Sequence, residues 1–271
     1  MPFDIVLPLV VCIATMVTIW LHPKIQSRIK LLFREDQELR VRDAFLLVVT
    51  MGIMITVVVF IPQQAIQILF LAAYSFLLFL FTYIAVEKWY LAVVPPVAFL
   101  ALYSSSFWNV VVLDFFALVF AVCISVYLSG LFSWKTVIAF AALITVMDVI
   151  QVMGTGYMGE AAGKFVELRL PVFVQVPLFP IQHEEFTSIL LGLGDIFLSG
   201  LLAIQTTQKF GRKAGFICAA SIGLAFAVFE VAFFYSSFAA YFPATLVVVC
   251  GWLLGLGMYN LVRRVRSSEP L

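Results

Sequence analysis

Nine apolar stretches take up most of this 271-residue chain, and each is long enough, or nearly long enough, to cross a hydrocarbon core of about 30 Å. With 64% hydrophobic and 11% charged residues, against about 25% charged in soluble domains, the composition excludes a soluble globular fold. The sequence therefore predicts one membrane domain over 1–271, an all-α polytopic bundle of nine transmembrane helices. The predicted spans are 3–21, 43–61, 65–86, 89–104, 107–130, 134–153, 186–207, 213–236 and 242–262.

The charge balance and the cysteines exclude several classes of partner. A formal net charge of +1 creates no field that attracts nucleic acid, so the lipid bilayer is the expected partner. All four cysteines lie in apolar stretches with no CxxC or Cys/His spacing, and we expect buried free thiols. We interpret His183, with its neighbours Glu184 and Glu185, as a solvated helix entrance in preference to a metal site. We expect no metal and no organic cofactor.

The sixteen Lys and Arg residues predict the orientation, because loops rich in these residues stay in the cytoplasm. Only Lys164 and Arg169 fall on one face of the predicted bundle. The others fall on the opposite face: Lys24, Arg28, Lys30, Arg34, Arg40, Arg42, Lys88, Lys135, Lys209, Arg212, Lys213, Arg263, Arg264 and Arg266. The sequence thus predicts a multi-pass protein of the cell membrane with its N-terminus outside, its C-terminus in the cytoplasm and the loop 154–185 outside. The first span, which no cleavage pattern follows, is expected to be retained.

Two loops are longer than simple connectors. Residues 24–34 alternate apolar and basic side chains at helical spacing, which predicts an amphipathic helix on the cytoplasmic leaflet. In 154–185, four early glycines are expected to loosen the chain, and the proline-bounded segment 168–177 is rich in β-branched residues and predicts extended structure. Two interpretations stay open: this segment folds back on the rim of the bundle, or it offers a strand to an extended substrate.

Four acidic residues lie well inside predicted spans, away from their ends, where ionised groups are costly and each is a functional hypothesis. Asp114, Asp148 and Glu230 lie roughly 9 Å from the external helix ends, and Asp195 roughly 14 Å, at a rise of about 1.5 Å per residue. No Lys or Arg shares this layer, so some of the four should be protonated. For Asp114 and Glu230 we favour a protonated carboxyl that is hydrogen-bonded across the bundle over a position in a proton pathway.

The glycines before Asp195 distinguish it from the others. Gly192-Leu193-Gly194-Asp195 lets another backbone approach closely and lets the helix unwind beside the acid, while Asp148 lies at similar depth on the preceding antiparallel span. Two neighbouring aspartates share a proton, so one activates water while the other polarises a peptide carbonyl. The chain has no HExxH motif, and Ser199 has no evident base. An aspartyl protease dyad is the predicted chemistry.

These residues resemble the GxGD motifs of the presenilin and signal peptide peptidase superfamily of intramembrane aspartyl proteases. The likeness covers the whole chain and rests on Asp148 in the sixth span, Gly192-Leu193-Gly194-Asp195 in the seventh, and Pro243-Ala244 opening the ninth. The segment with Glu160-Ala161-Ala162 and the run 170–177 look most like the compact archaeal members. The resemblance implies a presenilin-like bundle with its catalytic pair on the sixth and seventh spans.

Carried over by position, the catalytic pair is Asp148 and Asp195. The residues that the resemblance assigns to binding or positioning substrate are Gly192, Leu193, Gly194, Pro243, Ala244, Thr245, Leu170, Val172 and Val174. Two positions depart from the family pattern. Met147 stands where the family has Tyr, so no hydroxyl is expected there, and Thr245 brings a hydroxyl where the family's Pro-Ala-Leu motif has an alkyl group.

The implied activity is endopeptidase cleavage within transmembrane helices of membrane proteins or signal-peptide remnants. The predicted orientation is that of signal peptide peptidase, so we expect substrates with a cytoplasmic N-terminus, cut in the outer half of the bilayer, with part of 168–177 pairing to unwound substrate. The main alternative is a proton- or cation-coupled transporter or channel that uses the four acids as a relay. A prepilin-peptidase-like GxGD enzyme that cuts at the membrane face and a non-catalytic scaffold are further alternatives.

Overall fold

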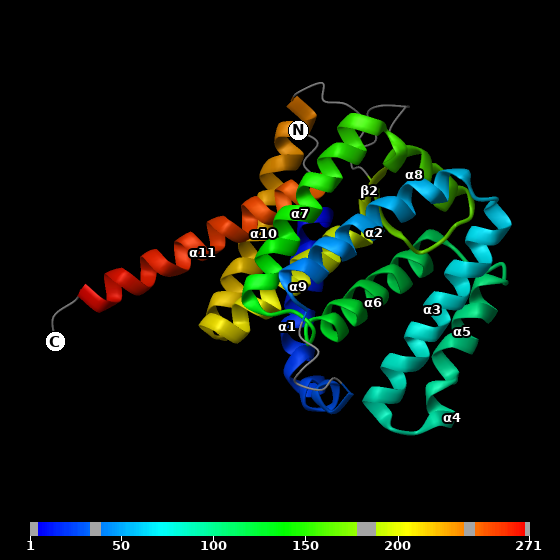
Figure 1. Ribbon diagram of the computed structural model, residues 1–271, viewed down its shortest axis with the longest axis horizontal. Coiled ribbons are helices and arrows are strands. Elements are labelled where there is room, and N and C mark those ends of the chain that lie inside the picture. Colours follow the sequence, from blue (N-terminus) through cyan, green and yellow to red (C-terminus); the bar gives the residue numbers. More distant parts are fainter. Residues whose placement is uncertain (1–4, 33–38, 178–187, 236–241, 269–271) are drawn as a thin grey trace.

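The computed structural model describes residues 5–32, 39–177, 188–235 and 242–268 as a helical bundle with a two-stranded sheet at one end (Figure 1). The elements in chain order are α1 (Val6–Leu32), α2 (Val41–Phe60), α3 (Gln63–Val86), α4 (Trp89–Ala92), α5 (Val94–Tyr103), α6 (Val110–Leu128), α7 (Trp134–Val149), the π-helix η2 (Ile150–Thr155), α8 (Tyr157–Glu167), β1 (Phe173–Pro177), β2 (Ser188–Gly192), α9 (Leu193–Phe210), α10 (Arg212–Tyr235) and α11 (Ala244–Ser268).

Seven helices of the described chain are long and apolar enough to cross a membrane. They are Val6–Gln26, Val41–Phe60, Gln63–Val86, Val110–Leu128, Trp134–Thr155, Arg212–Ala232 and Ala244–Val265. This confirms the prediction of an all-α, multi-pass membrane protein. The fourth predicted span is two short helices, α4 and α5, because Pro95 and Pro96 lack the N–H groups that would continue the helix from Leu91 and Ala92. The seventh predicted span corresponds to α9, which has 18 residues.

Helix α9 lies at the centre of the bundle and packs against α1, α6, α7, α10 and α11. Small and polar side chains make its closest contacts. A Cβ added to Gly200 would lie 2.8 Å from Ser125 Oγ, and the hydroxyls of Thr15 and Ser199 are 2.9 Å apart. Gln205 Nε2 donates to the carbonyl oxygen of Ser129 at 3.0 Å. In lipid, close backbone approach and interhelical hydrogen bonds of this kind hold helices together.

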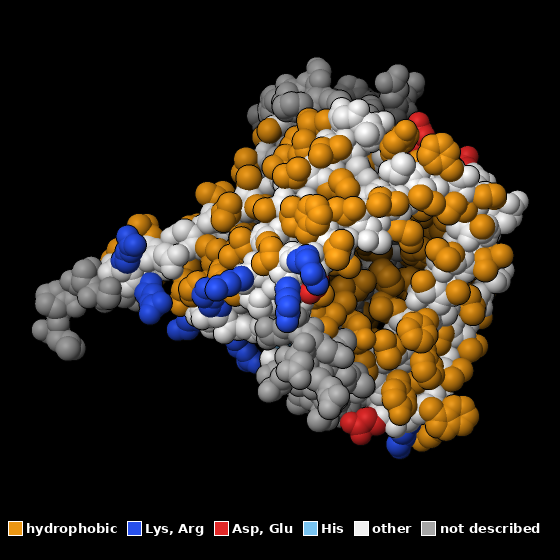
Figure 2. All heavy atoms as spheres, viewed as in Figure 1, with side chains coloured by type: hydrophobic (Ala, Val, Ile, Leu, Met, Phe, Trp, Pro, Cys, Tyr) orange, Lys and Arg blue, Asp and Glu red, His pale blue; other side chains and the backbone are white. Residues whose placement is uncertain are grey.

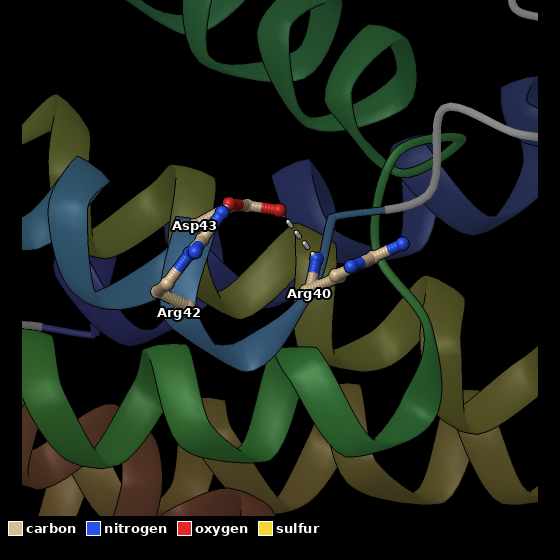
Figure 3. A network of polar contacts seen from close by, with 3 residues as sticks. All are labelled: Arg40, Arg42 and Asp43. Atoms are coloured by element: carbon tan, nitrogen blue, oxygen red, sulfur yellow. Dashed lines mark hydrogen bonds and ion pairs between the residues drawn. The ribbon is translucent and has the colours of Figure 1, made fainter.

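The beginning of α2 carries charged residues (Figure 3). Arg40 precedes the helix, and its backbone N–H donates to Asp43 Oδ2 at 2.9 Å, while Arg42 Nε lies 4.0 Å from Asp43 Oδ1. A carboxylate in the first turn satisfies a helix N–H group and interacts favourably with the helix dipole. Figure 2 shows Lys and Arg side chains gathered over this end of α2 and along the far end of α11. This is the face that the sequence assigns to the cytoplasm, and the orientation stays a prediction.

Helix α8 replaces the irregular chain expected after the sixth span. That expectation is wrong for residues 154–167, because η2 and α8 are helical and the backbone turns only at Gly156, where φ is 72°. Lys164 on α8 donates through Nζ to three carbonyl oxygens at the end of α2, those of Val58, Val59 and Ile61, at 3.2, 2.5 and 3.0 Å. A cation suits this position because the last carbonyls of a helix have no partners within the helix.

Two other boundaries differ from the prediction. A helix over 186–207 is wrong at its start, since Ser188–Gly192 is a strand held by pairing with β1 and the helix begins at Leu193. Asp195 therefore lies in the first turn of α9, not roughly 14 Å along it. Helix α1 runs on to Leu32, so most of the predicted amphipathic segment 24–34 continues the first helix. Residues 33 and 34 of that segment lie outside the described chain.

Candidate active site

Asp148 lies at the end of α7 and meets the beginning of α11. Thr245, the second residue of α11, donates its hydroxyl to Asp148 Oδ2 at 2.7 Å, and its backbone N–H donates to the same carboxyl. The first N–H groups of a helix have no partner within the helix, which makes them ready donors to an anion. Pro243 directly precedes α11 and is buried, so the direction in which the chain leads into this helix is fixed. The structure thus brings the predicted Pro243-Ala244-Thr245 segment to Asp148.

Asp195 is the third residue of α9, directly after β2. The backbone N–H groups of Gly192 and of Asp195 donate to its carboxyl. A Cβ added to Gly192 would lie 3.1 Å from Asp195 Oδ2, tighter than ordinary contact, so a side chain at this position would push the carboxyl away. Space at Gly194 is open, and nothing lies within 4 Å of a Cβ added there. Crowding therefore explains the first glycine of the motif and not the second.

The two carboxyls lie close enough to interact electrostatically, and both are half-buried. Helix α7 packs against both α9 and α11, which sets the two acids beside each other although 46 residues separate them in the chain. Two carboxyls that interact do not ionise together readily, which makes this pair a candidate for sharing one proton. The pair is therefore a candidate for general acid and base chemistry.

The strands β1 and β2 form an antiparallel ribbon that runs directly into α9. Phe173 pairs with Gly192 and Val174 with Leu191, and the N–H of Leu193 donates to the carbonyl oxygen of Val172 at 3.0 Å. This confirms the prediction of extended structure for 173–177; the prediction is wrong for 168–172, where the chain turns. The partner strand belongs to the same chain, so the position of the ribbon is tied to the first turn of α9 and therefore to Asp195.

The predicted residues of this segment face inward. Leu170 and Val174 are each 2% exposed, and Val172 is half-buried. Val174 packs with Val176 and Leu191 in the main apolar core, while Leu193 is buried at the start of α9. These side chains hold the ribbon on the bundle. Interaction with another chain at this ribbon would therefore go through backbone groups.

The other two intramembrane acids lie on α6 and α10. Asp114 accepts a hydrogen bond at Oδ1 from the backbone N–H of Gln175 in β1, at 2.8 Å. A bond across the bundle was expected for this residue, and its partner is a strand backbone. Glu230 is 1% exposed on α10. Neither sequence spacing nor hydropathy indicated the pairing of Asp114 with the strand.

A groove between α2 and the end of α7 was missed by sequence reasoning. It has a volume of about 300 Å³ and lies beside Met147, the neighbour of Asp148 in the chain. Gln151 Nε2 donates to the carbonyl oxygen of Gly52 at 2.8 Å, and a Cβ at Gly52 would collide with Met147 Cε. A lone Gly and a lone Gln in apolar stretches gave too little signal. The lining residues are Gly52, Ile53, Thr56, Val57, Met147, Ile150, Gln151, Thr155 and Tyr157.

Within the described ranges, no group of three or more His, Cys, Asp and Glu side chains is placed to hold a metal ion. His183, Glu184 and Glu185, the predicted helix entrance, lie outside these ranges. In comparisons with known proteins, no protein-family model matches the chain and no curated protein matches it.

Proposed function

We propose that this protein is an intramembrane aspartyl endopeptidase of the presenilin and signal peptide peptidase superfamily, with Asp148 and Asp195 as its catalytic pair. The observation that carries the proposal is the meeting of these two carboxyls, from α7 and from the first turn of α9, within one half-buried site. A shared proton between two carboxyls is the arrangement that cleaves peptide bonds in aspartic proteases.

The reaction follows from the two carboxyls. The ionised aspartate takes a proton from water while the water oxygen bonds to the peptide carbonyl carbon, and the protonated aspartate donates to the carbonyl oxygen. The gem-diol then collapses: the C–N bond breaks, the aspartate that took the proton from water gives it to the leaving amine nitrogen, and the other aspartate takes its proton back from a gem-diol hydroxyl. Donation from the Thr245 hydroxyl holds the Asp148 carboxyl in one orientation during these steps. No metal or organic cofactor takes part.

Substrate backbone is proposed to pair with the outer edge of β2. A helix must unwind before its peptide bonds can be cut, and its freed N–H and C=O groups then need partners. The carbonyl of Val172 faces the chain at Leu193, so the alternation of an antiparallel pair turns the backbone groups of Leu190 and the carbonyl of Gly192 away from β1, while the Gly192 N–H donates to Asp195. The hypothesis that 168–177 itself pairs with substrate is therefore revised, and β1 supports the strand that does.

The proposal also includes a route for substrate entry and an orientation of the protein in the membrane. The groove between α2 and η2 is lined mainly by apolar side chains and lies beside the Asp148 turn, which suits the entry of a helix from lipid. With nine spans, an external N-terminus and a cytoplasmic C-terminus, the enzyme would cut helices whose N-terminus is cytoplasmic, in the outer half of the bilayer. Cleavage confined to helices of the reverse orientation would contradict this part.

The test is mass spectrometry of a transmembrane-helix reporter incubated with the purified protein. Wild type is compared with Asp148→Ala, Asp195→Ala and the control Asp43→Asn. Asp43 is an acid in the first turn of α2 and is not part of the proposed pair. We expect discrete fragments cut within the hydrophobic stretch for wild type and control, and none for either alanine variant. Equal fragments from all four proteins would refute the assignment of the dyad.

A proton- or cation-coupled transporter is the alternative, favoured by the presence of acids on four helices, α6, α7, α9 and α10. A relay tolerates exchange of Asp for Glu with partial activity, whereas a dyad tolerates almost none. Proton flux into liposomes, abolished by Asp148→Ala and retained by Asp148→Glu, would support the transporter and contradict the protease.

A further inference from the structure

We propose that Asp114 is a positioning residue that closes the outer edge of β1 and fixes the β1–β2 ribbon against α6, which leaves β2 as the edge where a third strand adds. The part that concerns substrate rests on the proposed function. The part that concerns the strand edge rests on the contact between Asp114 Oδ1 and the Gln175 N–H, at 2.8 Å.

The alternation of the ribbon identifies this edge. The carbonyl of Val172 faces β2, because it accepts from Leu193, so Val174 and Val176 face β2 as well. Phe173, Gln175 and Pro177 therefore turn their backbone groups to the other side. Pro177 has no N–H, and the N–H of Gln175 is taken by Asp114, so two of the three positions offer no free donor there. Native sheets protect their edges with prolines and with charged side chains in this way.

Further side chains hold the segment that leads into β1. Tyr103 donates through its hydroxyl to the carbonyl oxygen of Leu168 at 2.8 Å, and Trp108 Nε1 donates to that of Arg169 at 3.0 Å. Both donors lie on or next to α5 and α6. Since α6 also packs against α9, one helix contacts both the strand and the helix that carries Asp195. Asp114 is the residue of α6 that bonds to the backbone of β1 itself.

The role requires an acceptor oxygen and not a titratable acid. The Oδ1 atom accepts the Gln175 N–H whether or not the other oxygen carries a proton, and an asparagine presents the same oxygen. A member of a proton relay must instead gain and lose a proton, which asparagine cannot do. Asp114→Asn therefore separates the two roles, and Asp114→Leu, of similar size, removes the acceptor.

Hydrogen exchange of the full-length protein in lipid nanodiscs tests the edge directly, with no reference to proteolysis. We expect the Gln175 amide to exchange at least about tenfold faster in Asp114→Leu, and at the wild-type rate in Asp114→Asn and in the control Asp43→Leu. Unchanged exchange in Asp114→Leu overturns the inference. Fast exchange in Asp114→Asn also overturns it, because the acceptor oxygen would then be insufficient.

Cleavage of the reporter tests the consequence for substrate. Asp114→Leu opens a second edge, so we expect a several-fold loss of the wild-type product and additional cut positions, while Asp114→Asn keeps the wild-type pattern. Gln175→Pro removes the donor N–H and keeps the outer edge of β1 closed, so its cut positions should match those of wild type. This variant provides the test if Asp114→Leu fails to fold. Additional cut positions in Gln175→Pro overturn the inference. Expected exchange behaviour with no cleavage by wild type would overturn the proposed function and leave the edge assignment intact.

Discussion

Helices α2 and α9 are of similar length, 20 and 18 residues, and they differ sharply in how much of each is buried. Helix α2 is one of the seven that are apolar enough to span a membrane by composition, yet it buries only Ala44, Val48 and Gly52. Helix α9 is not among the seven and buries most of its length. Its buried residues are Leu193, Ile196, Phe197, Leu198, Ser199, Gly200, Leu201, Leu202, Ala203, Ile204, Gln205 and Thr206.

The difference shows that lipid and protein select different side chains. Phe45 and Ile53 on α2 are 51% and 57% exposed, because hydrocarbon tails surround large apolar groups as well as a protein core does. The buried face of α9 instead uses Gly200, Ser199 and Gln205, which permit close approach or bond to a neighbouring helix. Two of the polar residues that lower the hydropathy of α9, Ser199 and Gln205, thus help to fix its place at the centre, next to the candidate site.

The largest effect is expected at the first turn of α9. Asp195→Asn should lower kcat by at least about a thousandfold, since one partner of the acid–base pair is lost. Asp43→Asn, in the first turn of α2, should leave kcat within about twofold, because asparagine keeps the oxygen that accepts from the Arg40 N–H and the residue is not part of the proposed pair. Rates of fragment formation by mass spectrometry measure both, with thermal unfolding as the control for folding. A comparable loss in Asp43→Asn would show that the two first turns do not differ in function.

The next effect concerns apolar side chains. Leu201→Ala on α9 should lower the free energy of unfolding by about 2–4 kcal/mol, because Leu201 is fully buried and its removal leaves a cavity. Ile53→Ala on α2 should change it by less than about 0.5 kcal/mol, since lipid fills the space. Denaturant titration in mixed micelles gives both values. Equal losses would contradict the contrast between the two helices.

Glycines sharpen the same contrast. Gly200→Ala should destabilise by about 1–3 kcal/mol, because its Cβ would lie 2.8 Å from Ser125 Oγ and 3.0 Å from Ser125 Cβ, which are short and cannot swing aside. Gly52→Ala should cost less than about 1 kcal/mol, because the colliding atom is Met147 Cε, the end of a flexible side chain. Gly257→Ala on α11 meets nothing within 4 Å and is the matched control. A larger loss at Gly52 than at Gly200, measured by thermal unfolding, would reverse the ranking.

The smallest expected effect extends the comparison to the start of α11. Thr245→Val removes the hydroxyl that donates to Asp148 and should lower kcat by about tenfold with KM unchanged, since a hydrogen bond to a charged group contributes roughly 1.5 kcal/mol. Thr245→Ser keeps the hydroxyl and should retain most of the activity. Steady-state kinetics on the reporter separates kcat from KM. A valine variant with wild-type kcat would show that the hydroxyl has no role in the reaction.

Several features were predictable because they depend on short stretches of sequence. Hydropathy located the membrane helices, since the cost of placing each residue in lipid is local and nearly additive. Prolines and β-branched residues predicted extended structure in 168–177, where β1 lies. The same local reasoning failed at Ser188–Gly192, an apolar segment that resembles a helix and is a strand because β1 pairs with it.

By itself, the sequence determined that this chain belongs in a membrane and that its fold is helical. It also showed that Asp114, Asp148, Asp195 and Glu230 lie within apolar segments, where an ionised carboxylate is costly. The tertiary structure alone decided their partners: Thr245 for Asp148, 97 residues away, and the Gln175 N–H for Asp114, 61 residues away. Hydropathy sums over neighbours along the chain, whereas a hydrogen bond depends on which helices pack together and at what register. Only the folded bundle fixes that choice.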